Sequence, residues 1–353
     1  MTHLSENQPK QDIEPAYPSF SIVFETENLS SVELENIYRS LASLDAQEIS
    51  PNQANEFLII DGGYAPVEVI EQLCAKYSWI TVRSAPGISY HEAKMLGANL
   101  ATGDIVVACD SDCMYEPNWL KNMLTPFQNS DVNVVAGETS TLIRNSYELA
   151  IAMNYLFPRF SNREEPYASK HYFLNGVAFR RDFLLQNPIP CDLPLYRGHC
   201  KIHTHILCNV QGHVIWKHPQ ARALHEPPTV SFISRRYFRM GCDSILIRRL
   251  NSLANPNQAA TQISSTHSNR TLYSRVINRL KEHAKPEQAL EVLREDKRRI
   301  LMLPIAIPII LWFRMLFSLG RVTTYFQLDR LLKTYRNAID ESNKSAFSEA
   351  QNL

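Results

Sequence analysis

Two aspartates separated by one residue follow an uninterrupted apolar run near the middle of the first half of the chain. The run covers residues 105–109, and the carboxylates are Asp110 and Asp112. Five apolar residues in a row predict a strand that is buried on both faces, as in a parallel sheet. Ligands of open α/β sheets bind outside the carboxyl ends of the strands, and Mg²⁺ is usually held by one or two carboxylates together with substrate phosphates. The pattern predicts a site for a divalent cation and a phosphorylated ligand, with a solvated Asp-Ser-Asp turn as the alternative.

The segments around this run alternate between strand-like and helix-like patterns. Strands are expected at residues 20–24, 57–60, 80–82, 105–109 and 132–136, with helices between them. This alternation is typical of an α/β fold with a doubly wound, mostly parallel sheet and helices on both faces. Glu25, Glu27 and Asp61 follow the first two strands and are expected to meet Asp110 at one edge of the sheet. They would accept hydrogen bonds from ribose hydroxyls or a base N–H, and solvated acidic loops are an equal alternative.

Composition limits the classes of function. The chain has 353 residues and a formal net charge of +0, which allows one large α/β domain plus an appendage and predicts no nucleic-acid partner. The seven cysteines are odd in number and scattered, which favours a reducing compartment. Residues 1–18 are polar, with neither a basic segment nor an apolar one. We therefore expect a disordered leader and no signal peptide.

Four motifs in sequence resemble glycosyltransferase family 2, whose members have the GT-A fold. They are SIVFETEN, EFLIIDGG, SYHEAKMLGANLATGDI and VVACDSDC, and they lie within residues 20–140. A looser similarity continues to residue 240. The resemblance assigns the nucleoside to Glu25, Glu27 and Asp61. It places Lys94 at the diphosphate, Asp110 towards the ribose or the sugar, and Asp112 on the metal.

The resemblance also implies a reaction. A hexosyl group would move, with inversion, from a nucleotide-diphosphate sugar to a lipid-carrier or glycan acceptor. A divalent cation, Mg²⁺ or Mn²⁺, would neutralise the leaving diphosphate as a Lewis acid, and Lys94 would add electrostatic stabilisation. An acceptor hydroxyl also needs a general base within hydrogen-bond reach.

The second half of the chain departs from the family pattern at the expected base. Where the family has an acidic pair, this chain has Tyr-Arg-Gly-His-Cys at residues 196–200, without a carboxylate. His199 is the predicted base because histidine titrates near neutrality. The alternatives are that Asp192 is the base or that His199 is a structural loop residue. Further along, His225 stands where many family members place a histidine, so it is predicted to approach the metal or the diphosphate.

Four potential zinc ligands follow one another closely after this point. They are Cys200, His203, His205 and Cys208. At about 100° per residue, their side chains would spread around a helix and would not converge on one ion. We therefore do not predict zinc there.

The C-terminal part predicts a contact with a membrane. Following a catalytic domain at residues 19–250, we expect a linker at 251–270, a helical region at 271–339 and a disordered tail at 340–353. Residues 301–320 are strongly apolar, which is about the length needed to span a bilayer, but Pro304, Pro308 and Arg314 interrupt them. A surface-bound or re-entrant segment, or a helix packed on the domain or on a second subunit, is the alternative. Without a signal peptide, the expected location is the cytoplasmic face of a membrane.

Three functions remain in competition. The first is a metal-dependent, membrane-associated glycosyltransferase. The second is a nucleotide-sugar-binding module of the same fold that has lost its base. The third is a nucleotidyltransferase, because two carboxylates and a metal also serve that chemistry. The sequence contains no oligomerisation motif and does not name the sugar, the nucleotide base or the acceptor.

Overall fold

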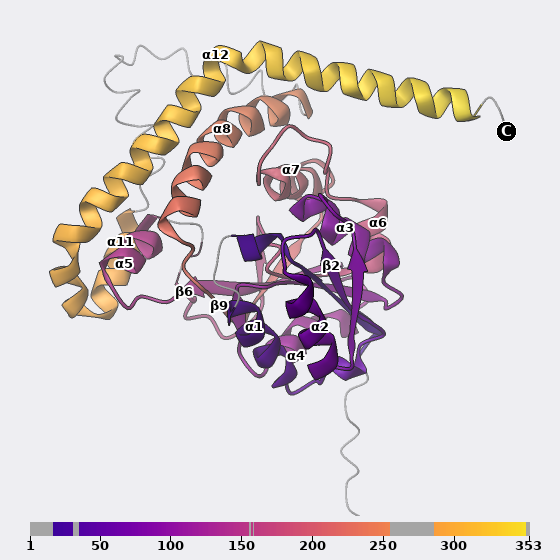
Figure 1. The fold of residues 1–353 in the computed structure, drawn as a ribbon, viewed down its shortest axis with the longest axis horizontal. Coiled ribbons are helices and arrows are strands. Elements are labelled where there is room, and N and C mark those ends of the chain that lie inside the picture. Colours follow the sequence, from indigo (N-terminus) through magenta and orange to yellow (C-terminus); the bar gives the residue numbers. More distant parts are fainter. Residues whose placement is uncertain (1–16, 31–34, 155–156, 158, 255–285, 351–353) are drawn as a thin grey trace, which may run out of the picture.

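The computed structural model describes residues 17–30, 35–154, 157, 159–254 and 286–350. These residues form a sheet domain and a helical extension, which Figure 1 shows at the lower right and the upper left. The expected leader at 1–18 and linker at 251–270 lie almost wholly outside the described residues.

The described residues form a mixed nine-stranded sheet in the order β3-β2-β1-β4-β8-β6-β9-β5, with β7 paired to β9. Strands β1 to β4 are parallel neighbours, and β8 is antiparallel to both β4 and β6. The predicted α/β class with a mostly parallel sheet in the first half is confirmed. The strands are β1 (Phe20–Glu25), β2 (Phe57–Asp61), β3 (Ile80–Ser84), β4 (Ile105–Asp110), β5 (Cys113–Tyr115), β6 (Val134–Thr141), β7 (Tyr167–Ser169), β8 (Gly176–Arg180) and β9 (Ile215–His225).

Helices cover both faces of the sheet because successive strand residues point to opposite sides. In β1, Ile22 and Phe24 belong to one apolar core and Val23 to the other. Helices α1 (Glu35–Asp45), α2 (Val67–Lys76) and α4 (Trp119–Leu124) contribute to the first core. Helices α3 (Tyr90–Leu100) and α6 (Arg181–Gln186) contribute to the second, and α7 (His199–His205) lies beside it.

The helical extension contains α5 (Ser146–Asn154), α8 (Val230–Ala254), α11 (Pro286–Glu295) and α12 (Leu303–Ala350). The first part of α12 packs on α5 and α8 through buried Ile151, Tyr237 and Phe313, and α12 then extends past the sheet domain (Figure 1). The sequence analysis expected a disordered tail from residue 340, whereas α12 continues to Ala350. No proline or glycine follows Gly320, so nothing in the sequence stops the helix.

Helices α8 and α12 make backbone contact where each has a glycine. A Cβ atom at Gly241 would clash with the carbonyl oxygen of Phe317, and one at Gly320 would clash with that of Phe238. The Tyr237 ring stacks on Phe313 nearby, with centroids 4.7 Å apart and an interplanar angle of 7°. The close approach fixes α12 against the helix that leads out of the sheet domain.

We predict that Gly241→Ala lowers the stability of the helical extension by about 1–3 kcal/mol, because the new Cβ meets a backbone atom that cannot move aside. On an isolated helix the same change would stabilise by up to about 1 kcal/mol, so the sign of the effect tests the contact. Thermal unfolding and hydrogen exchange of α12 measure it.

Gly176→Ala is the matched control, because its Cβ would have no neighbour nearer than 3.8 Å. A Gly241→Ala protein that is as stable as the wild type, with unchanged exchange in α12, would disprove the contact.

Candidate active site

The parallel strands bring acidic residues to one edge of the sheet. Glu25 at the end of β1 pairs in register with Asp110 at the end of β4, and both are buried. Asp61 ends the neighbouring strand β2 and accepts a hydrogen bond of 2.7 Å from the Thr26 hydroxyl. The structure thus places three of the sequence-predicted nucleotide-binding residues along adjacent strand ends.

Asp110 is the most heavily bonded carboxylate of this edge. The Lys94 ammonium lies 2.9 Å from its Oδ1, and both side chains are at most 5% exposed. The Tyr90 hydroxyl donates to Oδ2 at 2.8 Å, and the Asn28 amide donates to Oδ2 at 3.0 Å. Tyr90 and Lys94 lie one turn apart on α3, so one helix face supplies two of the donors. Lys94 is therefore occupied by Asp110 and by the Cys109 carbonyl oxygen, to which it also donates.

Glu25 is a buried carboxyl group with an unusual proton affinity. Burial raises its pKa to about 8, with Lys94 lowering it and Asp110 raising it further. Its Oε2 accepts a hydrogen bond from the Glu27 backbone N–H, while its Oε1 has no partner within the described part of the chain. Glu25 therefore holds a proton over much of the neutral range, and its Oε1 is a buried oxygen without a hydrogen bond.

Asp112 and His225 form the pair best suited to a metal ion. Strand β5 pairs with β9 so that Cys113 lies opposite His225, and Nε2 of His225 is 3.2 Å from Oδ2 of Asp112. Nδ1 of His225 lies 2.6 Å from the Glu226 carbonyl oxygen. A proton on Nδ1 satisfies that contact and leaves the Nε2 lone pair facing Asp112, the arrangement usual for a metal-bound histidine.

The electrostatics of the pair agree with its geometry. Burial opposes charge on both groups, but the Asp112 carboxylate raises the pKa of His225 above its ordinary value. In turn, the pKa of Asp112 is lowered: burial raises it, and the charge of His225 outweighs that effect. A divalent cation would replace the imidazolium proton as the partner of Asp112.

Cys113 is a possible third ligand that the sequence analysis missed. Its Sγ lies within 4.8 Å of the ligand atoms of Asp112 and His225. Burial, Asp112 and Asp110 raise the pKa of its thiol well above the usual range, and the thiolate is the form that binds metals. Asp112 and His225 are thus the donors that fit a hard cation such as Mg²⁺ or Mn²⁺.

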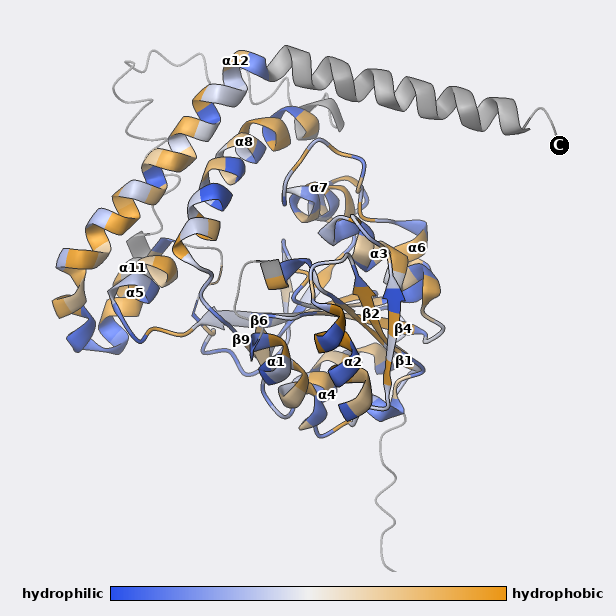
Figure 2. Cartoon of the chain, viewed as in Figure 1, coloured by the Kyte–Doolittle hydropathy of each residue, from blue (hydrophilic) through white to orange (hydrophobic). Residues whose placement is uncertain are grey.

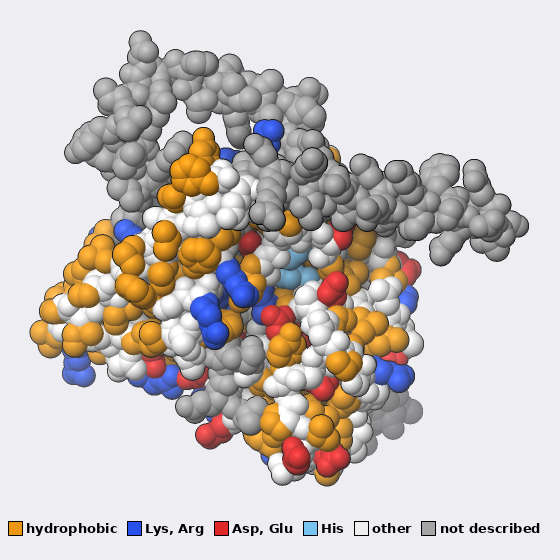
Figure 3. Space-filling model, turned by 45° about the horizontal axis from the view of Figure 1, so that its top comes forward, with side chains coloured by type: hydrophobic (Ala, Val, Ile, Leu, Met, Phe, Trp, Pro, Cys, Tyr) orange, Lys and Arg blue, Asp and Glu red, His pale blue; other side chains and the backbone are white. Residues whose placement is uncertain are grey.

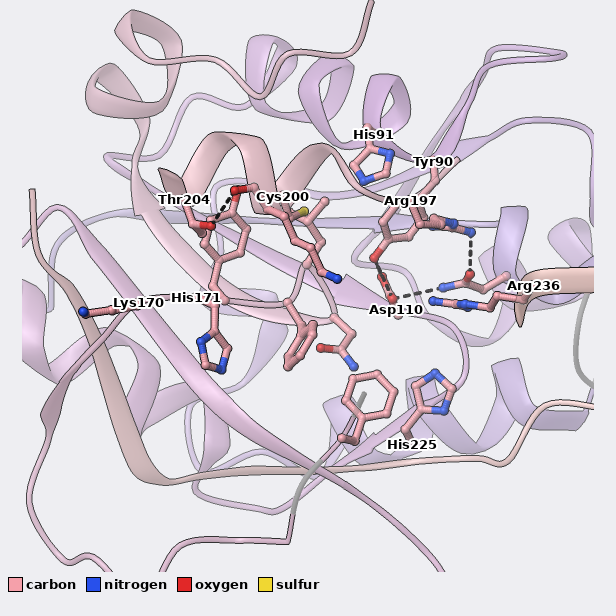
Figure 4. Close-up of a pocket in the computed structure, with 17 residues that line it drawn as sticks. Tyr90, His91, Asp110, Lys170, His171, Arg197, Cys200, Thr204, His225 and Arg236 are labelled. Atoms are coloured by element: carbon pink, nitrogen blue, oxygen red, sulfur yellow. Dashed lines mark hydrogen bonds between the residues drawn. The ribbon is translucent and has the colours of Figure 1, made fainter. Parts of the chain in front are cut away.

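A cavity of about 470 Å³ opens beside these residues. Figure 4 shows Asp110, Arg197, Arg236 and His225 at one end, and Lys170, His171 and Thr204 towards the other. Aromatic and amide side chains also line the cavity, namely Tyr90, Phe157, Tyr172, Phe173 and Asn175. The cavity is therefore a channel that runs from Asp110 and His225 towards Lys170, His171 and Thr204.

Arg197 closes the channel at the Asp110 end, and the sequence analysis did not select it. Its guanidinium group lies 3.2 Å from Glu27 Oε1 and 3.0 Å from Asn28 Oδ1. It also lies 3.7 Å from the centroid of the Tyr90 ring. Asp243 of α8 accepts the backbone N–H of Arg197 at 2.9 Å, which fixes the loop before α7. Arg197 is 170 positions from Glu27, so no local sequence pattern predicts the contact.

The structure places His199 apart from the channel. Its ring packs on His91 with centroids 4.1 Å apart, and its Nε2 lies 3.3 Å from the Leu193 carbonyl oxygen. His91 lines the channel, whereas His199 and Asp192 do not. Burial lowers the pKa of both histidines. Among the four residues that we did not expect to bind zinc, His203 contacts the Tyr172 hydroxyl at 2.6 Å and the Asn187 carbonyl at 2.9 Å.

Comparison with known proteins identifies the domain. Residues 31–187 match the family model described as Glycosyl transferase family 2. This is the family that the four sequence motifs resemble. The mixed sheet and its flanking helices have the GT-A architecture of the solved structures that follow.

Two solved structures share the fold. A mannosyltransferase from Pyrobaculum calidifontis, in complex with GDP-Man and Mn²⁺, superposes with a TM-score of 0.50 at 14% identity, covering 87% of this chain and 88% of that one. GalNAc-T7 with UDP, GalNAc and Mn²⁺ gives a TM-score of 0.50 at 15% identity, covering 62% of this chain and 45% of that one.

One curated relative shows local sequence similarity. It is a glucosyl-dolichyl phosphate glucuronosyltransferase from Haloferax volcanii, 40% identical over 53 residues. The matched stretch is 15% of this chain and 16% of that protein.

We predict that Glu25→Gln becomes increasingly more stable than the wild type as the pH rises from 4.5 to 8. The pKa of Glu25 is raised in the folded state to about 8, so over this range the native state binds more protons than the unfolded chain, and folding loses stability as the pH rises. The neutral amide removes that loss, which is on the order of 4 kcal/mol. Denaturant unfolding at several pH values measures it.

Glu56→Gln is an opposite-sign control, because hydrogen bonds from Ser21 and Thr102 outweigh burial and lower the pKa of Glu56. This variant should become less stable than the wild type above the pKa of glutamate. Parallel pH dependence for Glu25→Gln and the wild type would show that folding does not raise the pKa of Glu25.

Proposed function

We propose that this protein is a metal-dependent, inverting glycosyltransferase that moves a hexosyl group from a nucleotide-diphosphate sugar to a lipid-carried or glycan acceptor. The observation that carries the proposal is the buried Asp112–His225 pair, 3.2 Å apart, of which His225 lines the channel together with Asp110. The family match and the fold support the reaction class. That the two similar structures are titled as Mn²⁺ complexes supports the cation.

The residues divide into three tasks in this proposal. Asp112 and His225 hold the divalent cation, which would stabilise the charge of the leaving diphosphate. Glu25, Glu27, Asp61 and Asp110 form the nucleoside and ribose side at the strand ends. Arg197 and Arg236 line the same end of the channel and are the cations that we assign to the diphosphate.

Lys94 lies behind the residues that line the channel. It is 3% exposed and bonded to Asp110, so we assign it the positioning of that carboxylate. This differs from the direct diphosphate contact expected from the family resemblance.

A binding module without catalytic power is the second candidate. The observation that favours it is that Asp110 is the sole carboxylate among the described residues that line the channel, and Lys94 already neutralises it. An acceptor hydroxyl would find no free carboxylate base there. Turnover of a nucleotide sugar separates the two candidates.

We predict that Asp112→Asn abolishes metal-dependent binding of one nucleoside diphosphate and reduces turnover by about 100-fold or more, because the cation supplies several kcal/mol of stabilisation to the transition state. Calorimetry with UDP, GDP, CDP and dTDP, each with and without Mn²⁺, identifies the donor class. Turnover is then measured with the corresponding sugar nucleotides.

Asp104→Asn is the matched control, because that carboxylate bonds Ser19 on the surface at 2.7 Å. Metal-dependent turnover that survives Asp112→Asn would remove Asp112 from the metal site. Failure of the folded wild type to bind any of the four diphosphates would reject the proposed function.

We further propose that the first part of α12 rests in a membrane surface. The segment Lys297–Gln327 has a mean hydropathy of 2.2 in its most apolar window, of which 17% is buried. Figure 2 shows the apolar residues along this part of α12. One side packs on α5 and α8. Leu311 and Phe326 of α12 are 59% and 82% exposed, and Leu301, in the 3-10 helix Lys297–Met302 just before α12, is 84% exposed. A helix that is packed on one side and apolar on the other suits an in-plane position.

The cytoplasmic side is the location that we propose for the domain. All seven cysteines are free, including the buried Cys109 and Cys113, as expected for a reducing compartment.

We predict that replacing Leu301, Leu311 and Phe326 together by serine reduces vesicle binding by about 100-fold or more, because burying each such side chain is worth about 1.5–3 kcal/mol. Co-flotation with phospholipid vesicles measures it. The control replaces three exposed valines of the sheet domain, Val67, Val210 and Val214, by serine and should leave flotation unchanged. Equal flotation of both triple variants would exclude this face of α12 as the membrane contact.

A further inference from the structure

The residue after β9, Glu226, is bonded through its backbone to both members of the Asp112–His225 pair. Its carbonyl oxygen lies 2.6 Å from Nδ1 of His225, and its N–H donates to the Asp112 carbonyl oxygen at 2.9 Å. The second ring nitrogen of a metal-bound histidine usually donates to such an oxygen, and this partner sets the tautomer and the orientation of the ring. The position of the Glu226 backbone therefore determines how Nε2 of His225 faces Asp112.

The side chain of Glu226 is held by two arginines from other parts of the chain. Its Oε1 forms an ion pair with Nη2 of Arg144, and its Oε2 lies 3.5 Å from Nη1 of Arg39 on α1. The Glu226 side chain is only 14% exposed, and a carboxylate that is largely removed from water depends on such partners to keep its charge. Glu226 is therefore fixed by its side chain as well as by its backbone.

Arg144 is itself anchored at the start of α5. Its Nε donates to both carboxylate oxygens of Glu148, at 3.0 and 3.1 Å, and its backbone N–H donates to the same carboxylate. Glu148 is buried in the first turn of α5. The planar guanidinium group has enough donors to bind two carboxylates at once. Arg144 therefore bridges Glu148, in the helical extension, to Glu226, beside the metal-ligand pair.

The chain beyond Glu226 makes a second contact with α5. Pro227 and Pro228 follow Glu226, and proline restricts both its own φ and the conformation of the residue before it. The Tyr147 hydroxyl of α5 donates to the Pro228 carbonyl oxygen. On the face drawn in Figure 3, basic and acidic side chains lie between the apolar surface of the helical extension and the sheet domain. Helix α5 thus supports a stiff segment that begins at the metal-ligand pair.

We propose that Arg144 is a positioning residue for the metal ion: acting through Glu226, it holds His225 in the orientation and tautomer in which Nε2 can bind the cation together with Asp112. This inference rests on the proposed function. Arg144 and Glu226 line a separate cavity of about 330 Å³, so Arg144 acts on the ion through Glu226 and not by contact with the donor. Loss of partners that lie behind the metal ligands typically costs about 10–100-fold in metal affinity or activity.

The test measures the Kd for Mn²⁺ of the full chain in detergent, by electron paramagnetic resonance, with the nucleoside diphosphate that the wild type binds. We expect Arg144→Gln to raise this Kd about tenfold or more, and turnover to recover as the Mn²⁺ concentration is raised. Removing a positive charge would by itself favour a bound cation, so weaker binding reports the position of His225. A purely structural defect would reduce the amount of folded protein and leave the Kd of the folded fraction unchanged.

Arg299→Gln is the matched control, because Arg299 pairs with Glu295 at 2.6 Å elsewhere in the helical extension. It removes the same charge and the same kind of ion pair without touching Glu226, and should leave the Kd for Mn²⁺ within about twofold. An unchanged Kd in Arg144→Gln, or an equal rise in Arg299→Gln, would overturn the assignment.

A double-mutant cycle tests the route through Glu226. Glu226→Gln keeps the backbone groups but loses the ion pair, so it should also weaken Mn²⁺ binding about tenfold. If Arg144 acts through Glu226, the combined variant should bind Mn²⁺ within about twofold of Glu226→Gln alone, because the two changes remove one interaction. Losses that multiply would overturn the route. A folded wild type that binds no Mn²⁺ with UDP, GDP, CDP or dTDP would instead reject the proposed function itself.

Discussion

The buried contact between Lys94 and Asp110 is the interaction on which the site depends. Removing two charges from water is costly, and such a pair is tolerated when further hydrogen bonds complete it. Here Tyr90 and Asn28 supply those bonds, so α3, β4 and the turn after β1 are held to one another at a single carboxylate. Because the parallel strands put Asp110 at the edge of the sheet, this local arrangement also fixes where Ser111 and Asp112 emerge from β4.

A series of contacts connects that carboxylate to α12. Arg197 lies on the Tyr90 ring and bonds Asn28, and Asp243 of α8 holds the backbone of Arg197. Helix α8 in turn contacts α12 at Gly241 and Gly320. The sheet domain and α12 are therefore joined by short, fixed contacts. These contacts give the channel a defined orientation relative to any surface on which α12 rests.

Sequence patterns were sufficient to predict features that depend on neighbouring residues or on a regular spacing of apolar residues. Buried strands, amphipathic helices and polar strand ends predicted the α/β class, and four ordered motifs predicted the family, since each depends on neighbours within a few positions. Sequence patterns did not select Arg197 or Cys113. Arg197 reaches the site through a tertiary contact across 170 positions, and Cys113 lies opposite His225 because two distant strands pair in antiparallel fashion. The expected tail at 340–353 illustrates a different limit: polar composition suggested disorder, while α12, in which no proline or glycine follows Gly320, continues to Ala350.

The pairing of β5 with β9 has a consequence for how the chain can be divided. Asp112 and His225 meet across this pair, yet the family-matching segment ends at residue 187, well before β9. A fragment that stops there would keep strands β1 to β4, at whose ends we place the nucleoside. It would keep Asp112 but lack His225. The unit recognised by sequence similarity is therefore smaller than the unit that holds the proposed site, which is complete only once β9 has joined the sheet.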